Sequence, residues 1–234
     1  FRLAPAAAIA AFTAGAVNNS VAQLYPVFAQ TVSPTAAAGF AANFNAAVLA
    51  GAMVGLWPAG MISDRIDRRL VIAATGLLGG VCALALGLLA VTASPVIILI
   101  LAFGYGAGAL SFYAVAVAHA ADKVSASRAT PMMAGILVLW GIGSIVGPIL
   151  SGFVMTPLGG PGLFFFTAAA LALLAALMFT RIVNAVPVAS DDKEPFNATQ
   201  ATSLALSDLD PRGEQTNEQF DLFLAWMASE ETDE

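Results

Sequence analysis

The stretch Trp57-Pro58-Ala59-Gly60-Met61-Ile62-Ser63-Asp64-Arg65-Ile66-Asp67-Arg68-Arg69 decides the fold of this chain. Five of its last six residues are charged, whereas the apolar run on either side carries no charge for more than twenty residues. In so apolar a chain, a charged stretch between two apolar runs is typical of a short loop on one face of a membrane. Because Lys and Arg are retained on the cytoplasmic side, the loop is predicted to be cytoplasmic.

Composition predicts that most of the chain lies within a lipid bilayer. Of the 234 residues, 59% are hydrophobic and only 10% are charged. A membrane-spanning helix needs about 20 apolar residues, and six spans are predicted, at residues 5–29, 36–62, 70–92, 95–121, 129–155 and 160–183. The apolar runs are continuous rather than alternating, which indicates helices and not a membrane barrel. The predicted fold class is an all-α membrane protein with six transmembrane helices over residues 1–183 and a largely disordered acidic tail.

The basic residues predict the orientation of these spans. Residues 1–183 hold seven cations, which all fall before span 1, in the 2–3 and 4–5 connections or after span 6: Arg2, Arg65, Arg68, Arg69, Lys123, Arg128 and Arg181. The other three connections carry no charged residue. All cations and both termini are therefore predicted to be cytoplasmic, in a multi-pass protein of the bacterial cytoplasmic (inner) membrane.

Uncharged polar and aromatic residues gather on spans 1, 2, 4 and 5. Asn18 and Asn19 lie near the midpoint of span 1, where amide side chains need other helices or a watery cavity as partners. Helix–helix hydrogen bonding is the alternative, and our interpretation is a pathway for a small-molecule substrate. Its candidate residues are Asn18, Asn19, Gln23, Tyr25, Asn43, Asn45, Tyr105, Ser111, Tyr113 and Trp140.

Glycine patterns predict where helices pack closely. Gly51-x-x-x-Gly55 in span 2 and Gly143-x-x-x-Gly147 in span 5 have the spacing that lets two helix backbones approach each other. The three glycines Gly104, Gly106 and Gly108 predict a thin, bendable span 4. Pro148 removes a backbone donor and is expected to kink span 5.

The charged stretch resembles the loop signature of the major facilitator superfamily (MFS). The residues that carry this resemblance are Gly60, Asp64, Arg65, Arg68 and Arg69. One position departs, because Asp67 stands where the family has Gly. The tight turn is then expected to be less free, since Asp tolerates left-handed backbone less well than Gly.

The resemblance extends over residues 3–183. Further segments are similar to the C-terminal half of the YcaD-like branch of MFS transporters: Leu24-Tyr25-Pro26-Val27, Trp57-Pro58-x-Gly60, Tyr113-Ala114-Val115-Ala116-Val117-Ala118-His119-Ala120-Ala121-Asp122 and Gly143-Ser144-x-x-Gly147-Pro148. This resemblance implies helices seven to twelve of a twelve-helix protein. An N-terminal six-helix half is then the expected partner, either in sequence upstream of Phe1 or in a second chain.

The resemblance also implies a function, which is secondary active transport of a small solute by alternating access. In that scheme Asp64 accepts hydrogen bonds from a neighbouring helix terminus, and Arg65, Arg68 and Arg69 pair across the cytoplasmic gate. His119 titrates near neutrality and is a possible proton site. A helix-end histidine solvated by water is the alternative.

Two other functions stay open at this point. An intramembrane serine protease would pair Ser111 with His119, but on one helix these residues are separated by over about 10 Å of rise. A non-transporting or self-associating membrane scaffold is the second. One Cys and one His make no metal site, no cofactor is indicated, and no basic patch outside the membrane loops indicates nucleic acid. The chain is predicted not to be an enzyme.

Residues 184–234 form a tail of different composition. From Val183 onward the chain holds twelve acids and two cations, and an acidic, Ser/Thr-rich linker is predicted to be disordered. Thr216-x-x-Gln219 predicts the cap of a short helix over residues 217–229. That helix would either dock on a partner or fray.

Overall fold

The computed structural model describes residues 5–122 and 126–183 of the chain. The chain divides into two compact units, Phe1–Ala198 and Thr199–Glu234. The second unit and the rest of the predicted tail, with its helix at 217–229, lie outside the described residues. All of the described residues belong to the first unit.

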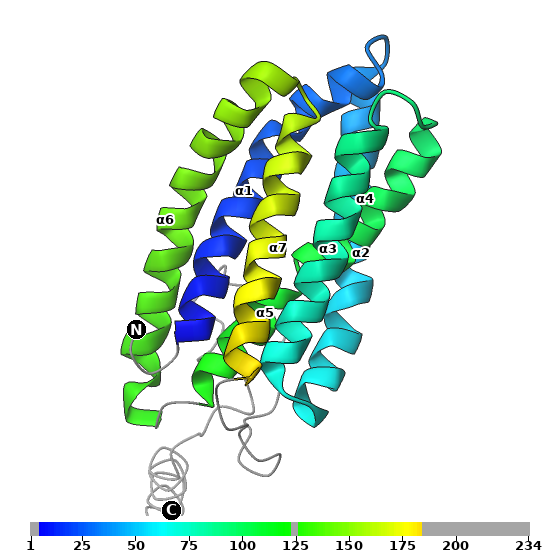
Figure 1. Cartoon of the computed structure of the whole chain (residues 1–234). Helices are drawn as coiled ribbons and strands as arrows, with labels where there is room; N and C mark the ends of the chain where they lie inside the picture. The colour runs from blue at the N-terminus through cyan, green and yellow to red at the C-terminus, as the bar shows by residue number, and fades with distance from the viewer. Residues whose placement is uncertain (1–4, 123–125, 184–234) are drawn as a thin grey trace, which may run out of the picture. The chain divides into compact units, whose positions relative to one another are not determined.

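The described part of the chain is a bundle of helices without strands (Figure 1). Its helices are α1 (Pro5–Val32), α2 (Ala37–Arg65), α3 (Arg68–Leu89), α4 (Pro95–Ala109), α5 (Phe112–Ala121), α6 (Ala126–Leu158) and α7 (Gly162–Val183). Within the bundle, one end carries the α2–α3 corner with Arg65, Arg68 and Arg69, and we call it the arginine end. The opposite end carries the α1–α2, α3–α4 and α6–α7 connections.

Five stretches among the described residues are long and apolar enough to cross a membrane. They are Ala37–Arg65, Arg68–Leu89, Pro95–Ala121, Thr130–Leu158 and Gly162–Arg181. The predicted first span is also a long helix, α1, with 28 residues, but it is not one of the five. Asn18, Asn19 and Gln23 lower its hydropathy, and these are the residues that suggested a pathway.

The fourth predicted span, at residues 95–121, coincides with the apolar stretch Pro95–Ala121, but its helix is interrupted. The helix stops at Ala109 and restarts at Phe112. At the break the Ser111 N–H donates to the Gly108 carbonyl at 3.3 Å, a contact three residues back that tightens the last turn. By contrast, α6 runs without interruption through Pro148.

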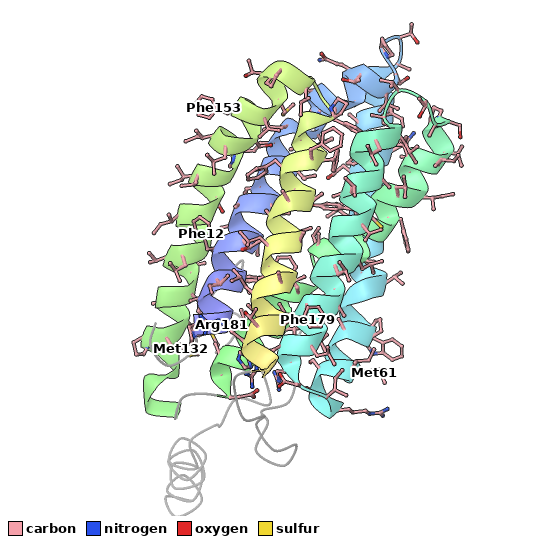
Figure 2. All side chains as sticks on the ribbon, in the orientation of Figure 1. Phe12, Met61, Met132, Phe153, Phe179 and Arg181 are labelled. Carbon is pink, nitrogen blue, oxygen red and sulfur yellow. The ribbon has the colours of Figure 1, made fainter. Side chains whose placement is uncertain are left out.

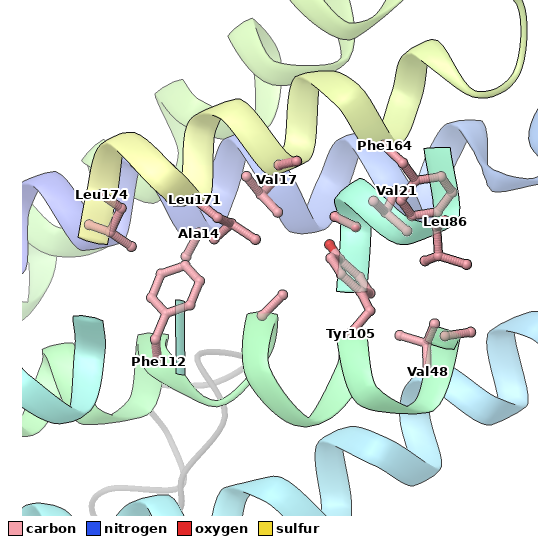
Figure 3. Packing of buried hydrophobic residues seen from close by; sticks show 14 of the residues in the cluster. Ala14, Val17, Val21, Val48, Leu86, Tyr105, Phe112, Phe164, Leu171 and Leu174 are labelled. Atoms are coloured by element: carbon pink, nitrogen blue, oxygen red, sulfur yellow. The ribbon is translucent and has the colours of Figure 1, made fainter. Parts of the chain in front are cut away.

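The interior of the bundle is filled by aromatic and aliphatic side chains. Figure 3 shows Tyr105 and Phe112, from α4 and α5, pointing toward α1 and α7. The Tyr105 and Phe164 rings meet edge to face with centroids 5.9 Å apart, and Phe164 also meets Phe28 at 4.6 Å and Phe44 at 5.8 Å. This aromatic cluster therefore joins α1, α2, α4 and α7 near the opposite end of the bundle.

Two pairs of helices cross with almost no side chain between them. A Cβ on Gly147 of α6 would lie 2.6 Å from the Ala16 carbonyl carbon on α1. A Cβ on Gly55 of α2 would lie 2.6 Å from the Cα of Ala107 on α4. The close packing predicted for both Gly-x-x-x-Gly patterns is thus present, between α1 and α6 and between α2 and α4.

The two crossings are copies of each other. Gly15, Phe12 and Ala16 of α1 make the contacts at one crossing that Gly106, Phe103 and Ala107 of α4 make at the other, each 91 positions later. On the partner helices the matching pairs are 92 positions apart, namely Val48 and Trp140, Gly51 and Gly143, and Gly55 and Gly147. The bundle therefore contains two related three-helix units, α1–α3 and α4–α7, if the interrupted α4–α5 segment is counted as one helix. The units run in opposite directions, because α1 ends at the end of the bundle where α4 begins (Figure 1).

The α2–α3 corner needs no left-handed residue. Asp67 has φ −60°, and its side chain accepts a hydrogen bond from the Arg69 N–H at 2.8 Å, which caps the start of α3. No non-glycine residue in the described ranges has a positive φ. The expectation that Asp67 makes the turn less free assumed a left-handed backbone, which Asp67 does not have; Asp is instead favoured at a helix N-cap.

Candidate functional site

Arg68 is the centre of a buried ionic cluster at the arginine end. It is the first residue of α3, and its side chain is only 1% exposed. Its Nε lies 3.1 Å from Oδ2 of Asp122, which follows α5 and is also 1% exposed, and its Nη2 lies 3.5 Å from Oδ1 of Asp64 on α2. One guanidinium thus ties the ends of three helices together. A guanidinium suits this position because it is always charged and offers several donors in a plane.

Arg69 ties in a fourth helix. Its Nε donates to Oδ1 of Asp67 at 3.2 Å, and its Nη1 donates to the backbone carbonyl of Arg181 at 3.0 Å. That carbonyl lies in the last turn of α7, where helix carbonyls lack intrahelical donors and the helix dipole favours a cation. In Figure 2 Arg181 lies among the charged side chains at this end of the bundle.

The other residues of the predicted gate differ in exposure. Gly60 is buried, and the Ser63 hydroxyl donates to its carbonyl at 2.8 Å. The Asp64 side chain is 40% exposed, and Arg65 is exposed. Arg68 and Arg69 make the contacts described above inside this bundle, and their pairing across a cytoplasmic gate stays a prediction. His119 is 5% exposed, so the expectation of a histidine solvated by water was wrong.

A second group of polar residues lies along α1. Asn19 Nδ2 donates to Ser144 Oγ on α6 at 2.8 Å and to the Gly15 carbonyl at 3.3 Å. Ser144 Oγ in turn donates to the Trp140 carbonyl at 2.8 Å. These bonds bridge α1 and α6 next to their close crossing. Asn19 therefore makes the interhelical contact that was the alternative to a pathway role.

Farther along the same face of α1, polar side chains are exposed. Gln23 and Gln30 are both exposed, with Pro26 between them, so Asn19, Gln23, Pro26 and Gln30 follow one another at spacings of four, three and four residues. We call these four residues the polar stripe. Asn18 lies beside the stripe, and its Oδ1 is buried with no hydrogen-bond partner among the described residues.

The remaining pathway candidates do not share one surface. Asn43 is exposed and Asn45 half-buried, near the start of α2, and Tyr25 stacks on Phe44 with centroids 6.2 Å apart. Tyr105 is fully buried in the aromatic cluster. The Ser111 hydroxyl donates to the Ala107 carbonyl at 2.8 Å, so it is bound within its own helical segment. Tyr113 and Trp140 are half-buried and pack against the core.

The helices beside α1 expose large apolar side chains. On α2, Met53, Trp57 and Met61 are exposed at intervals of four residues, and on α6 Ile145, Ile149 and Phe153 are exposed at the same intervals. Figure 2 shows Phe153 and Met61 projecting outward from the bundle. The polar stripe therefore lies on a helix whose neighbours present apolar surfaces.

Sequence reasoning missed three contributors. Asp122 ends a segment that carries the family resemblance, but its position in the chain does not reveal that it meets Arg68. Ser144 belongs to a packing motif, although its hydroxyl also accepts the Asn19 amide. Gln30 was overlooked, although its seven-residue spacing from Gln23 puts both on one face. In the described ranges no group of three His, Cys, Asp or Glu residues could hold a metal ion.

Comparison with known proteins agrees with these features. A sequence model described as the Major Facilitator Superfamily matches residues 7–227. The chain is 30% identical over 136 residues to "Uncharacterized MFS-type transporter YE1530" of Yersinia enterocolitica serotype O:8 / biotype 1B. The match spans 58% of this chain and 34% of that relative's length. No solved structure matches the chain. The family model covers nearly the whole chain, and the structure has the apolar helices of a membrane protein. The chain therefore belongs to the major facilitator superfamily of multi-pass membrane transporters.

Proposed function

We propose that this chain is one six-helix half of a secondary transporter, which moves a small solute across the membrane by alternating access. In this proposal α1 is the sixth membrane span beside the five more apolar stretches. The resemblance to the C-terminal half of the YcaD-like branch supports the assignment of the half. The Yersinia relative is about three times as long as the stretch it shares with this chain, which leaves room for a second half.

The polar stripe is the observation that carries the proposal. Gln23 and Gln30 are exposed on a helix of a membrane protein, and unpaired amides facing hydrocarbon are costly. A water-filled pathway along α1 removes that cost. The substrate would then meet amides and hydroxyls rather than fixed charges, and the second six-helix half would cover the same face by packing on α2 and α6.

The ionic cluster supplies the gate in this proposal. We place the arginine end and both termini on the cytoplasmic side of the inner membrane, because basic residues are retained there. Arg68 then holds α2, α3 and α5 together on the cytoplasmic side. Asp64 is the accessible member of the cluster, so its contacts are the ones that can change as the protein switches between inward and outward states.

We do not propose either of the two other functions, the intramembrane serine protease and the membrane scaffold. Ser111 is bound to a backbone carbonyl of its own segment, and we propose no catalytic role for it. Exposed amides on a spanning helix would also suit a self-associating scaffold, because amides bond across helices, and the uptake experiment separates that function from transport.

The experiment starts from a substrate search. Metabolites that accumulate or disappear in a knockout strain, relative to a complemented strain, name the candidate solutes for uptake into proteoliposomes. Asp64→Asn should then abolish or severely slow uptake while membrane insertion stays normal. Normal uptake by a well-inserted Asp64→Asn protein would remove the gate role, and the absence of uptake for any solute by the native protein would remove transport.

A further inference from the structure

The inverted copies place two corners in matching positions. The α2–α3 corner at the arginine end contains Arg68, and the α6–α7 corner at the opposite end contains Gly160, 92 positions later. The residue that Arg68 meets is Asp122, and 91 positions before it lies Thr31, in the last turn of α1. Thr31 is the residue that Gly160 meets.

The Arg68–Asp122 contact is ionic and made by long side chains, whereas the Gly160–Thr31 contact is uncharged and close to the backbone. At the arginine end a long charged side chain reaches a carboxylate across 3.1 Å. At the opposite end the contact needs the absence of a side chain. A Cβ on the buried Gly160 would overlap Thr31 Oγ1 and would lie 2.9 Å from the Cα of Phe28 and 3.3 Å from Thr31 Cβ. The α6–α7 corner therefore rests directly on α1.

The corner is built to present this glycine. Gly159 has φ +67°, a left-handed conformation that ends α6, and its N–H donates to the Met155 carbonyl at 2.7 Å. The chain then passes Gly160 and turns at once into α7, where the Phe164 N–H bonds to the Pro161 carbonyl at 3.0 Å. The neighbouring Phe28 and Phe164 belong to the aromatic cluster, with centroids 4.6 Å apart, so the corner closes over packed side chains.

We infer that the contact between Gly160 and Thr31 is an uncharged latch at the opposite end of the bundle, the counterpart of the Arg68–Asp122 latch at the arginine end. Each latch joins a corner of one three-helix unit to the end of a helical segment of the other unit. Movement of a corner away from the helix end that it contacts therefore strains the latch at that end of the bundle. The inference rests on the proposed transport function, because a latch matters only where the ends of a pathway open in turn.

If this contact is a latch, one methyl group added at Gly160 should move the α6–α7 corner away from α1 and open that end of the bundle. Gly160→Ala adds a Cβ that Thr31 and Phe28 leave no room for, so the corner must move away from α1. Gly39→Ala is the matched control, since Gly39 lies near the same end of the bundle and a Cβ there would meet nothing within 4 Å. Thr31→Ala is a second variant, which removes the hydroxyl without adding bulk.

The test measures access to the polar stripe. A cysteine at Gln23, in a Cys82→Ala background, is labelled with a membrane-impermeant maleimide, in cells from outside and in inside-out vesicles from the arginine side. Gly160→Ala should speed labelling from outside by roughly tenfold, the population change expected for a clash of one added carbon. Gly39→Ala should leave both rates unchanged. Adding Thr31→Ala to Gly160→Ala should return the outside rate toward that of the native corner.

Several outcomes would overturn the latch. They are an unchanged outside rate for Gly160→Ala, faster labelling only from the arginine side, or an equal effect of Gly39→Ala. If Gly160→Ala fails to insert, a faster outside rate for Thr31→Ala alone still supports the latch, and an unchanged rate overturns it. Labelling requires no substrate, so failure of the latch shows here, whereas failure of the transport function shows as absent uptake by the native protein.

Discussion

Arg68 at the start of α3 and Asp122 just beyond α5 form an ion pair of 3.1 Å in which both side chains are 1% exposed. Such a pair is costly to bury and costly to break, because removing one partner leaves the other charge without compensation in a low-dielectric interior. Its position at the junction of three helix ends makes it a structural joint as well as a candidate gate.

Replacing Arg68 by Met should destabilise the bundle strongly. The change leaves the Asp122 carboxylate buried without its guanidinium, which typically costs about 3–5 kcal/mol. Unfolding of the detergent-solubilised protein by SDS titration measures the effect. Combining Arg68→Met with Asp122→Asn should recover most of the loss, because neither position of the pair then carries a charge.

Arg65→Ala is the matched control for this experiment. Arg65 is three residues earlier and exposed at the end of α2, so its removal should change the free energy of unfolding by less than about 1 kcal/mol. An Arg65 effect as large as that of Arg68 would show that general charge at this end, and not the buried pair, provides the stability.

Two glycines of α6 should respond to alanine with opposite signs. At Gly147 the new Cβ would lie 2.6 Å from the Ala16 carbonyl carbon, so Gly147→Ala should destabilise by about 1–3 kcal/mol. At Gly141 nothing lies within 4 Å, and alanine should stabilise the helix by about 0.5–1 kcal/mol. Both are measured by the same unfolding titration, and equal signs would contradict the close crossing of α1 and α6.

Substitution of Asn19 should lower the free energy of unfolding, whereas substitution of Gln23 should affect transport alone. Asn19→Ala removes the 2.8 Å bond to Ser144, and a double-mutant cycle with Ser144→Ala should give a coupling of about 0.6 kcal/mol. Gln23→Ala changes an exposed side chain and should leave unfolding unaltered while it reduces uptake of the substrate. A Gln23 variant that transports normally would remove this residue from the pathway.

Asp67 should behave as a helix cap and not as a poor substitute for glycine. Asp67→Ala removes the acceptor of the Arg69 N–H and should cost about 0.5–2 kcal/mol, whereas Asp67→Asn should retain most of the cap. Because φ is −60°, Asp67→Gly should bring no gain in stability. Thermal unfolding of the three variants checks the order, and a stabilised Gly variant would contradict it.

Much of the fold could be predicted from composition. Continuous apolar runs indicated an all-helical membrane fold and the approximate ends of the long helices, because a bilayer leaves few other structures available. The Gly-x-x-x-Gly patterns identified helices that pack closely, since only small residues allow that approach. The charged corner and its family resemblance pointed to Arg68 as a residue of special importance.

The remaining features depend on pairings that sequence patterns do not encode. The partner of Arg68 is set by where α5 ends in space, and the break at Ser111 depends on a local change of hydrogen bonding. The inverted repeat is carried by a few glycines and their carbonyl contacts at separations of 91 and 92 residues, too sparse to be noticed before the crossings are seen. Burial likewise decided that His119 is enclosed, which its position at a helix end did not reveal.

The two glycine crossings have a mechanical consequence. At both crossings the contacts are between backbones, so no side-chain rotamer can change to absorb a displacement. We therefore expect α1 with α6, and α2 with α4, to behave as rigid pairs. In the proposed transport cycle, deformation is then expected at the interruption between α4 and α5 and at the α2–α3 and α6–α7 corners. A small molecule designed to arrest this protein would act best as a wedge at one of those joints.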